Sequence, residues 1–402
     1  MSGGSAGRPA LGFVFAAVMI DAMGIGLVMP VMPALLREVT GLGLDGAARW
    51  GGALSLCYAA MQFLCAPLLG ALSDRRGRRP VLLTSLAALG AAYLAMAAAG
   101  SIWTLLAARL AAGAAAATHS TAYAYVADVT APERRAARFG LLGAAFGLGF
   151  VLGPALGGAL GELGPRAPFL AAAALAFAAA GLGLAAAPES LPPERRRRRL
   201  SLRGAHPLRA LARAARMPGM GPILGAVLLY DLAIYAYPSV WSFHVAAAYG
   251  WSAGQVGMSL AAYGLVSGMA QAWLIRPALA RLGERRTALM GLGADALGAL
   301  GLAAALGGWS VYALMPLLGA AAMAGPAMTA MLSRRASEAA QGELQGVLAA
   351  LSGAAAMISP PVMTWIFDLF VGSGAPFQAP GAPFALAAAL AAGAALLLAA
   401  RA

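Results

Sequence analysis

Four ionisable side chains lie inside long apolar runs of this sequence and are the groups best placed to do chemistry. They are the carboxylates of Asp21, Asp231 and Asp295 and the guanidinium of Arg109. Ionisable groups are costly within a membrane span, so each is by default a candidate functional residue. A carboxyl group removed from water favours its protonated form and can release the proton when water or a cation reaches it. The three acids therefore predict proton-coupled chemistry.

Arg109 is predicted to line the polar cavity, where it either neutralises one of these acids or contacts an anionic group of a substrate. The alternative for the acids is structural. Each carboxylate would then pair with Arg109 or accept backbone hydrogen bonds at a helix break.

The elements that position these groups must be membrane helices. The 402 residues are 61% hydrophobic and 11% charged, whereas soluble domains average about 45–50% and 25%. One anchor of about 20 residues would leave the rest of the chain near average, so the apolar residues are divided among many spans. We predict an all-α membrane protein with twelve transmembrane helices in two groups of six. The expected spans are 11–36, 50–72, 80–99, 102–127, 139–160, 168–187, 220–245, 252–275, 287–306, 309–332, 345–367 and 384–400.

An arginine-rich polar stretch, 188–218, separates the two groups of spans. It is predicted to be a cytoplasmic linker between an N-terminal six-helix bundle (1–187) and a C-terminal one (219–402). The halves match at an offset of 206 residues, which indicates a duplicated unit with a substrate site between the halves and alternating access. The matched pairs are Trp103 and Trp309, Gly77 and Gly283, Gly113 and Gly319, Gly140 and Gly346, Gly147 and Gly353, and Pro154 and Pro360.

The basic residues predict the orientation. All 28 are arginines, and 24 of them fall on one side of the predicted spans. The positive-inside rule makes that side cytoplasmic, with both chain termini on it. Because the arginines are spread over every loop of that side, they form no single basic groove, and a nucleic-acid partner is not expected.

The sequence does not predict an enzyme. It offers no nucleophile paired with a base, no metal cluster and no phosphate-binding loop, so neither a cofactor, a resident metal nor direct ATP drive is expected. Cys57 and Cys65 both lie in apolar runs and predict no disulfide or metal site.

Two segments carry motifs with a physical role. In the loop before the third span, Gly70 permits close helix approach, Gly77 permits a tight turn, and Asp74 among arginines offers an ionic latch. The residues of this motif are Gly70, Asp74, Arg75, Gly77, Arg78 and Arg79. The fifth span is lined with glycines around a proline, which lets a helix pack flush against a neighbour and bend there. Its motif residues are Gly149, Gly153, Pro154, Gly157 and Gly158.

Both motifs resemble signatures of the major facilitator superfamily, the first its loop signature and the second its antiporter signature. Further segments resemble the tetracycline/proton antiporters of that superfamily. They are Asp21–Pro30, Tyr58–Gln62, Ala127-Asp128 and Gln345-Gly346. The resemblance implies a multi-pass protein of the bacterial cytoplasmic (inner) membrane, with the lipid bilayer, a small-molecule drug and protons as its partners. No obligatory protein partner is implied.

The same resemblance implies the roles of individual residues. Asp21 and Asp295 are implicated in transport and coupling, and Arg109 is required. Gln62, and Asp231 because of its place inside a span, are further candidate coupling or substrate residues. Asp74, Arg75 and Arg78 form a conformational latch with Asp128. The implied activity is export of tetracycline bound to a divalent cation such as Mg²⁺ in exchange for a proton.

One departure from the family pattern concerns the third span. Those exporters carry an aspartate just before a tyrosine, where this chain has Ala92 before Tyr93. Asp231 is not part of the pattern and is a candidate to compensate. Two alternatives remain open. One is an antiporter for another drug or a metabolite, and the other is a regulatory membrane protein of the same fold without transport.

Overall fold

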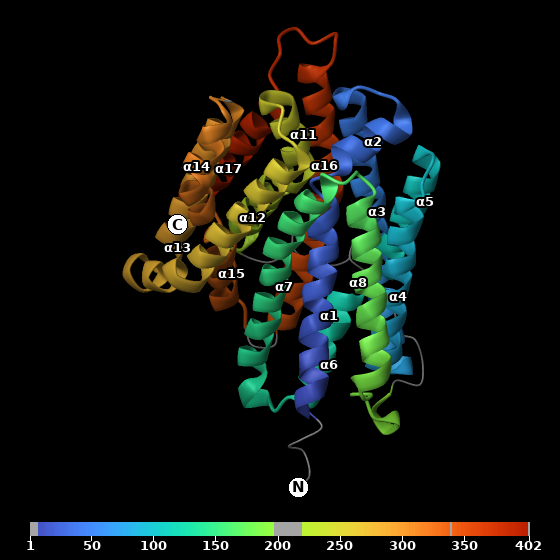
Figure 1. Cartoon of the computed structure of the whole chain (residues 1–402). Coiled ribbons are helices and arrows are strands. Elements are labelled where there is room, and N and C mark those ends of the chain that lie inside the picture. Colours follow the sequence, from blue (N-terminus) through green and yellow to red (C-terminus); the bar gives the residue numbers. More distant parts are fainter. Residues whose placement is uncertain (1–6, 197–218, 305, 338–339, 401–402) are drawn as a thin grey trace. The chain divides into compact units, whose positions relative to one another are not determined.

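The computed structural model describes residues 7–196, 219–304, 306–337 and 340–400 (Figure 1). Most of the predicted arginine-rich linker, residues 197–218, lies outside this part of the chain. Every regular element of the described residues is helical. The predicted all-α class is therefore confirmed for them.

The helices of the described residues can be divided into twelve segments that are each able to cross a membrane. Ten helical segments are long and apolar enough to cross a membrane. One of them, Ala253–Ala303, holds two crossings, because helix α13 (Ile275–Ala303) breaks at Gly283, where φ is 74°. A further crossing is divided between α5 (Ile102–Ala115) and α6 (Thr118–Val129), each too short to be counted alone. With these two additions the segments number twelve, which agrees with the predicted number of spans.

The remaining helices divide between the two halves of the chain. Those of the N-terminal half are α1 (Gly7–Val28), α2 (Met32–Thr40), α3 (Leu44–Arg76), α4 (Arg78–Ala97), α7 (Pro132–Gly161) and α8 (Ala167–Ala186). Those of the C-terminal half are α10 (Gly221–Ile234), α11 (Ala236–Tyr249), α12 (Ala253–Met269), α14 (Gly308–Ala321), α15 (Ala324–Arg335), α16 (Gln341–Val371) and α17 (Ala382–Ala400). Two short turns, η1 (Pro193–Arg195) and the π-helical η2 (Ala270–Leu274), complete the described structure.

The chain forms two compact units. The first comprises residues 1–35, 57–205 and 253–261, and the second comprises 36–56, 206–252 and 262–402. Equivalent helices pack together in each. In the first unit α1 packs on α7 and α8, and α4 packs on α5 and α8; in the second α10 packs on α16 and α17, and α13 packs on α14 and α17. This repeated packing supports the duplication predicted from the sequence.

The interruptions of the helices also repeat at the offset of 206 residues. The break between α5 and α6 falls at Ala116 and Ala117, and the break between α14 and α15 falls at Ala322 and Met323. Similarly, α1 ends just before Met29, and Tyr235 separates α10 from α11. Discontinuous helices in corresponding positions of two halves are the usual pointer to a transporter's binding site. The functional site should therefore lie near these breaks.

Glycines of the predicted antiporter motif allow α7 to lie directly against α1 (Figure 1). A Cβ atom at Gly149, Gly153 or Gly157 would collide with a backbone carbonyl oxygen of α1. The glycines recur every four residues, and so do the carbonyls they face, so the contact follows one stripe of each helix. The carbonyls belong to Met19, Met23 and Leu27.

We expect Gly157→Val to prevent stable folding. Its Cβ would overlap backbone atoms of Leu27, which cannot move away as a flexible side chain can. Forcing extra atoms into a packed contact costs about 1–3 kcal/mol or more. Gly147→Val is the matched control, because a Cβ at Gly147 meets nothing within 4 Å. Size-exclusion chromatography of the solubilised variants tests this; equal monodisperse yields of both would contradict it.

Candidate functional site

Asp21 lies beside the break between α5 and α6. Its carboxyl group is half-buried and lies near the side chain of Thr118, the first residue of α6. The first turn of a helix leaves its N–H groups without intrahelical partners and carries a partial positive charge, both of which favour a nearby carboxylate. The break thus gives Asp21 a polar environment within an apolar span.

Arg109 faces two tyrosines. Its guanidinium lies 5.9 Å from the centre of the Tyr58 ring, a cation–π distance, and Nη2 lies 3.7 Å from the sulfur of Met32. Tyr58 and Tyr93 are its principal electrostatic partners. Among the described residues Arg109 has no ion pair within 4.0 Å, and its Nε has no hydrogen-bond partner. Of the two roles predicted for Arg109, neutralising an acid is therefore not observed.

Tyr93 comes close to Asp21 because α1 has a glycine where the two helices meet. A Cβ at Gly24 would lie 2.8 Å from the Tyr93 hydroxyl oxygen, so a larger side chain would displace the ring. Tyr93 also interacts electrostatically with Asp21 and Tyr58. Ala92, the position of the departure from the family pattern, is buried and supplies no charge to this cluster.

Gln62 lies one helical turn beyond Tyr58 on α3 and is exposed. Because side chains four residues apart share a helix face, Gln62 lies on the face that carries Tyr58. Asp21 and Arg109 both lie near Tyr58, and together with Tyr93 and Thr118 they form what we call the N-terminal polar cluster.

Asp295 is the most deeply buried acid of the second unit, with a relative exposure of 1%. Its Oδ1 accepts a hydrogen bond of 2.8 Å from the hydroxyl of Tyr237 on α11. Its Oδ2 has no hydrogen-bond partner among the described residues. A buried carboxyl with one open oxygen is suited to binding and releasing a proton.

Asp231 lies on α10, before the break at Tyr235, whereas Tyr237 lies on α11, after it. The carboxyl group of Asp231 lies near the side chain of Ser352 on α16. The hydroxyls of Ser352 and Tyr235 are 3.3 Å apart, within hydrogen-bond distance. Asp231 and Asp295 both act electrostatically on Tyr230. The second unit therefore holds two acids near one helix break.

The loop between α3 and α4 brings together the residues of the predicted latch. The guanidinium of Arg78 lies 2.6 Å from Asp74 and 3.0 Å from Asp128, so it joins α3, α4 and α6. Gly77 turns the chain with φ of 106°, as predicted. Arg75 is exposed, and the Nη2 of Arg79 donates to the carbonyl of Leu184 at the end of α8.

The prediction for Gly70 is wrong in this conformation. A Cβ at Gly70 would meet nothing within 4 Å, so no helix makes the expected close approach there. Conversely, Glu189 was not predicted to take part. Its carboxylate accepts the backbone N–H groups of Arg78 at 2.8 Å and Arg79 at 3.3 Å, which caps the start of α4.

The equivalent loop of the second half keeps the ion pair with its charges exchanged. Glu284 and Arg334 form a salt bridge and stand 206 residues after Arg78 and Asp128 respectively. Arg285, equivalent to Arg79, likewise donates to carbonyls at the end of α17. This loop of the second half therefore has the same arrangement of contacts as the first, although its residues differ.

We expect the exchanged pair to tolerate reversal. Glu284→Arg alone places two arginines together and should reduce transport about threefold to tenfold, because like charges repel at this contact. Adding Arg334→Glu restores an ion pair in the order found in the first half, and transport should recover to within about twofold of wild type. Drug uptake into inverted membrane vesicles measures both. Independent, additive effects of the two substitutions would contradict the pairing.

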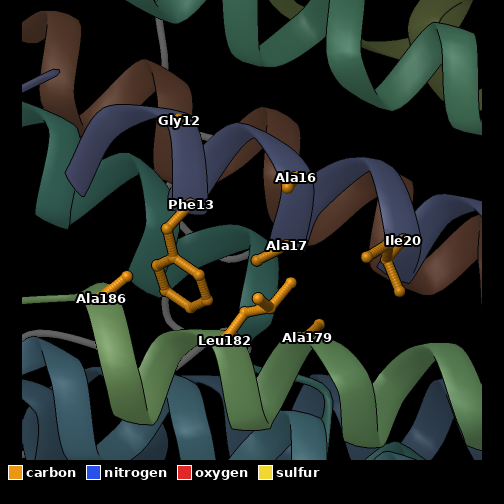
Figure 2. A pocket seen from close by; sticks show the side chains of 8 residues that line it. All are labelled: Gly12, Phe13, Ala16, Ala17, Ile20, Ala179, Leu182 and Ala186. Carbon is orange, nitrogen blue, oxygen red and sulfur yellow. The ribbon is translucent and has the colours of Figure 1, made fainter. Parts of the chain in front are cut away.

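An apolar groove of about 270 Å³ lies between α1 and α8. Figure 2 shows Phe13 of α1 and Leu182 of α8 pointing into it. Its other lining residues are Gly12, Ala16, Ala17, Ile20, Ala179 and Ala186. No titratable or hydrogen-bonding side chain lines this groove, so it is not the site at which a proton or a polar drug would bind.

Sequence reasoning missed the tyrosines and the hydroxyl that surround the predicted acids. Tyr58, Tyr93 and Thr118 contact or face Asp21 and Arg109, yet aromatic residues in membrane spans are common for packing and at interfaces. The sequence holds no signal for Tyr93, because its proximity to Gly24 exists only in the folded chain.

Comparisons with known proteins agree with the fold. The model of the Major Facilitator Superfamily matches residues 14–221 and 223–401. The chain is 42% identical to the class C tetracycline resistance protein of Escherichia coli, over 89% of each chain, and 39% identical to the class G protein of Vibrio anguillarum, over 88% of this chain and 89% of that one.

Solved structures of transporters share the fold of this chain. The human organic anion transporter MFSD10 is 26% identical, with a TM-score of 0.68 over 98% of this chain and 99% of that one. The nucleoside transporter NupG has a TM-score of 0.75 at 13% identity over 99% of each chain, a similarity of fold alone. The resemblance read from the loop and glycine motifs is confirmed.

Proposed function

Because this chain belongs to the Major Facilitator Superfamily, in which it groups with the tetracycline resistance proteins, we propose that it exports tetracycline in exchange for protons. Five relatives that bear that name share 35–42% of their residues with it. The observation that carries the proposal is the presence, in each unit, of a membrane acid at or near a helix break: Asp21 lies near Thr118, the first residue of α6, and Oδ1 of Asp295 accepts a hydrogen bond from the Tyr237 hydroxyl.

The proposed substrate is a chelate of the drug with a divalent cation such as Mg²⁺. This cation is cargo and not a resident metal. Arg109 has open donors over Tyr58 and is suited to an oxygen anion of the drug. Asp21 and Gln62 provide oxygen atoms, the ligands that Mg²⁺ prefers. Tyr58 and Tyr93 supply aromatic faces for a flat drug.

The proposed cycle uses alternating access. Protonation of Asp295 and Asp21 from outside releases the drug, and loss of these protons toward the cytoplasm allows the empty site to bind it again. Asp231 is a third acid on the same path and compensates for the uncharged Ala92. The aspartate latch at Arg78 holds the loop side of the first bundle during this cycle.

We also propose a membrane location and a domain organisation for the protein. The protein lies in the bacterial inner membrane as a single multi-pass chain with both termini cytoplasmic, and it acts as a transporter without enzymatic activity. Its bundles are residues 1–187 and 219–402, joined by a linker at 188–218. The excess of arginines on one side of the spans supports this orientation.

A susceptibility panel in a bacterium that lacks its own drug pumps tests the substrate. Expression should raise the inhibitory concentration of tetracycline at least about fourfold, and an uncoupler should remove intracellular exclusion of the drug, because transport is proton-driven. Protection against another drug without protection against tetracycline would favour the alternative antiporter, for which Ala92 is the supporting observation. No protection against any drug would favour a non-transporting protein of the same fold.

A further inference from the structure

The Asp295 carboxyl group is held asymmetrically. Its Oδ1 accepts the Tyr237 hydroxyl at 2.8 Å, while Oδ2 has no hydrogen-bond partner in the part of the chain that the structure describes. Both side chains are buried, with relative exposures of 1% for Asp295 and 5% for Tyr237. In such surroundings a hydroxyl that donates to one carboxyl oxygen fixes the rotation of the whole group. The two oxygens are therefore not equivalent.

The ring of Tyr237 is itself fixed from several sides. It stacks on Tyr263 of α12, with ring centres 6.2 Å apart and planes 11° apart. Phe384 of α17 packs on it at 5.5 Å, and Trp241 of its own helix lies at 6.4 Å. Three helices thus determine where the hydroxyl points, and it can serve as a rigid reference for the carboxyl group.

Tyr237 also lies in the first turn of α11, just past the break at Tyr235. Asp231 lies before that break, on α10. The break therefore places Asp231 and the hydrogen-bond donor of Asp295 on different helices.

We propose that Tyr237 is a positioning residue for proton transfer: its hydroxyl holds Oδ1 of Asp295, so that the transported proton binds at Oδ2 and leaves from it. Tyr237 keeps its own proton throughout, and the O–H bond that forms and breaks is the one at Oδ2. This inference rests on the proposed function, in which Asp295 carries a proton. It adds a residue that acts on the proton step and does not touch the drug.

The experiment compares Tyr237→Phe with wild type in two assays on inverted vesicles. One is tetracycline–Mg²⁺ accumulation driven by a proton gradient, and the other is exchange of labelled for unlabelled tetracycline without a gradient. The variant differs by one oxygen and keeps the ring contacts. We expect gradient-driven accumulation to fall about tenfold, as for loss of one hydrogen bond to a charged group, and exchange to stay within about twofold.

Tyr312→Phe is the matched control, because Tyr312 is exposed and its ring packs on Trp251. It should leave both assays unchanged. Equal activity of Tyr237→Phe and wild type in the gradient assay overturns the proposal, and so does a parallel loss of accumulation and exchange, which indicates a structural role. Failure of the wild type itself to couple tetracycline to protons refutes the proposed function instead, so the two failures are distinguishable.

Discussion

Replacing Asp295 with asparagine is expected to reduce tetracycline-dependent proton movement below about 1% of the wild-type rate, a loss of at least about 2.7 kcal/mol of transition-state stabilisation. Asparagine matches aspartate in shape and can still accept the Tyr237 hydrogen bond at Oδ1. It cannot take up and release a proton. Reconstituted protein with a trapped pH indicator measures the effect directly.

The control for this substitution is Asp45→Asn. Asp45 lies in the first turn of α3, away from the polar groups around Asp295, and its neutralisation should leave proton movement within about twofold of wild type. Retained exchange of labelled tetracycline would show that Asp295→Asn still folds and binds drug. Undiminished proton movement in the asparagine variant would contradict the assignment of Asp295 as a proton carrier.

Replacing Arg109 with glutamine is expected to reduce transport at least about 100-fold, with the loss appearing mainly as weaker drug binding. The guanidinium has no ion-pair partner among the described residues and has an unpartnered Nε, so its charge is available to the substrate. Arg109→Lys should not restore transport, because a lysine lacks the planar group that lies over Tyr58 and donates in several directions.

Arg37→Gln is the control for this prediction, since Arg37 is exposed in the last turn of α2. Equilibrium binding of tetracycline–Mg²⁺ separates the two possible roles. A glutamine variant that binds drug as tightly as wild type but transports slowly would mean that Arg109 acts in the conformational cycle and not in recognition. Full activity of Arg109→Lys would contradict the need for the guanidinium.

The membrane class, the twelve spans and the two loop turns followed from the sequence, because apolar length and glycine position act locally. Gly77 and Gly283 both adopt positive φ where the repeat predicted tight turns. Glycines 149, 153 and 157 lie against α1 because their spacing of four residues matches one face of a helix. Asp74 and the arginines of the latch were likewise identified from their charges, whereas Asp128 was identified from the family resemblance.

The helix break at Ala116 and Ala117 could not be predicted. Alanine is the best helix former, so the expected span 102–127 was continuous, and only the tertiary structure interrupts it. Yet this break provides Thr118 to Asp21. The ion pair between Glu284 and Arg334 was not predicted either, because its members are far apart in sequence and reverse the charges of the first half.

Tyr237 could not be singled out from the sequence. It stands among several aromatic residues of one helix, any of which could serve packing or the membrane interface. Its role depends on Asp295, which lies on α13, and on the ring contacts from α12 and α17. Those relations exist only in the folded chain.

Proton flux in proteoliposomes containing only this protein is the decisive measurement of coupling between drug export and proton entry. With a pH indicator inside and tetracycline–Mg²⁺ added, we expect drug-dependent proton movement opposite to the drug, abolished by Asp295→Asn and by an uncoupler. Drug transport with no accompanying proton movement, or proton movement that does not depend on the drug, would contradict it.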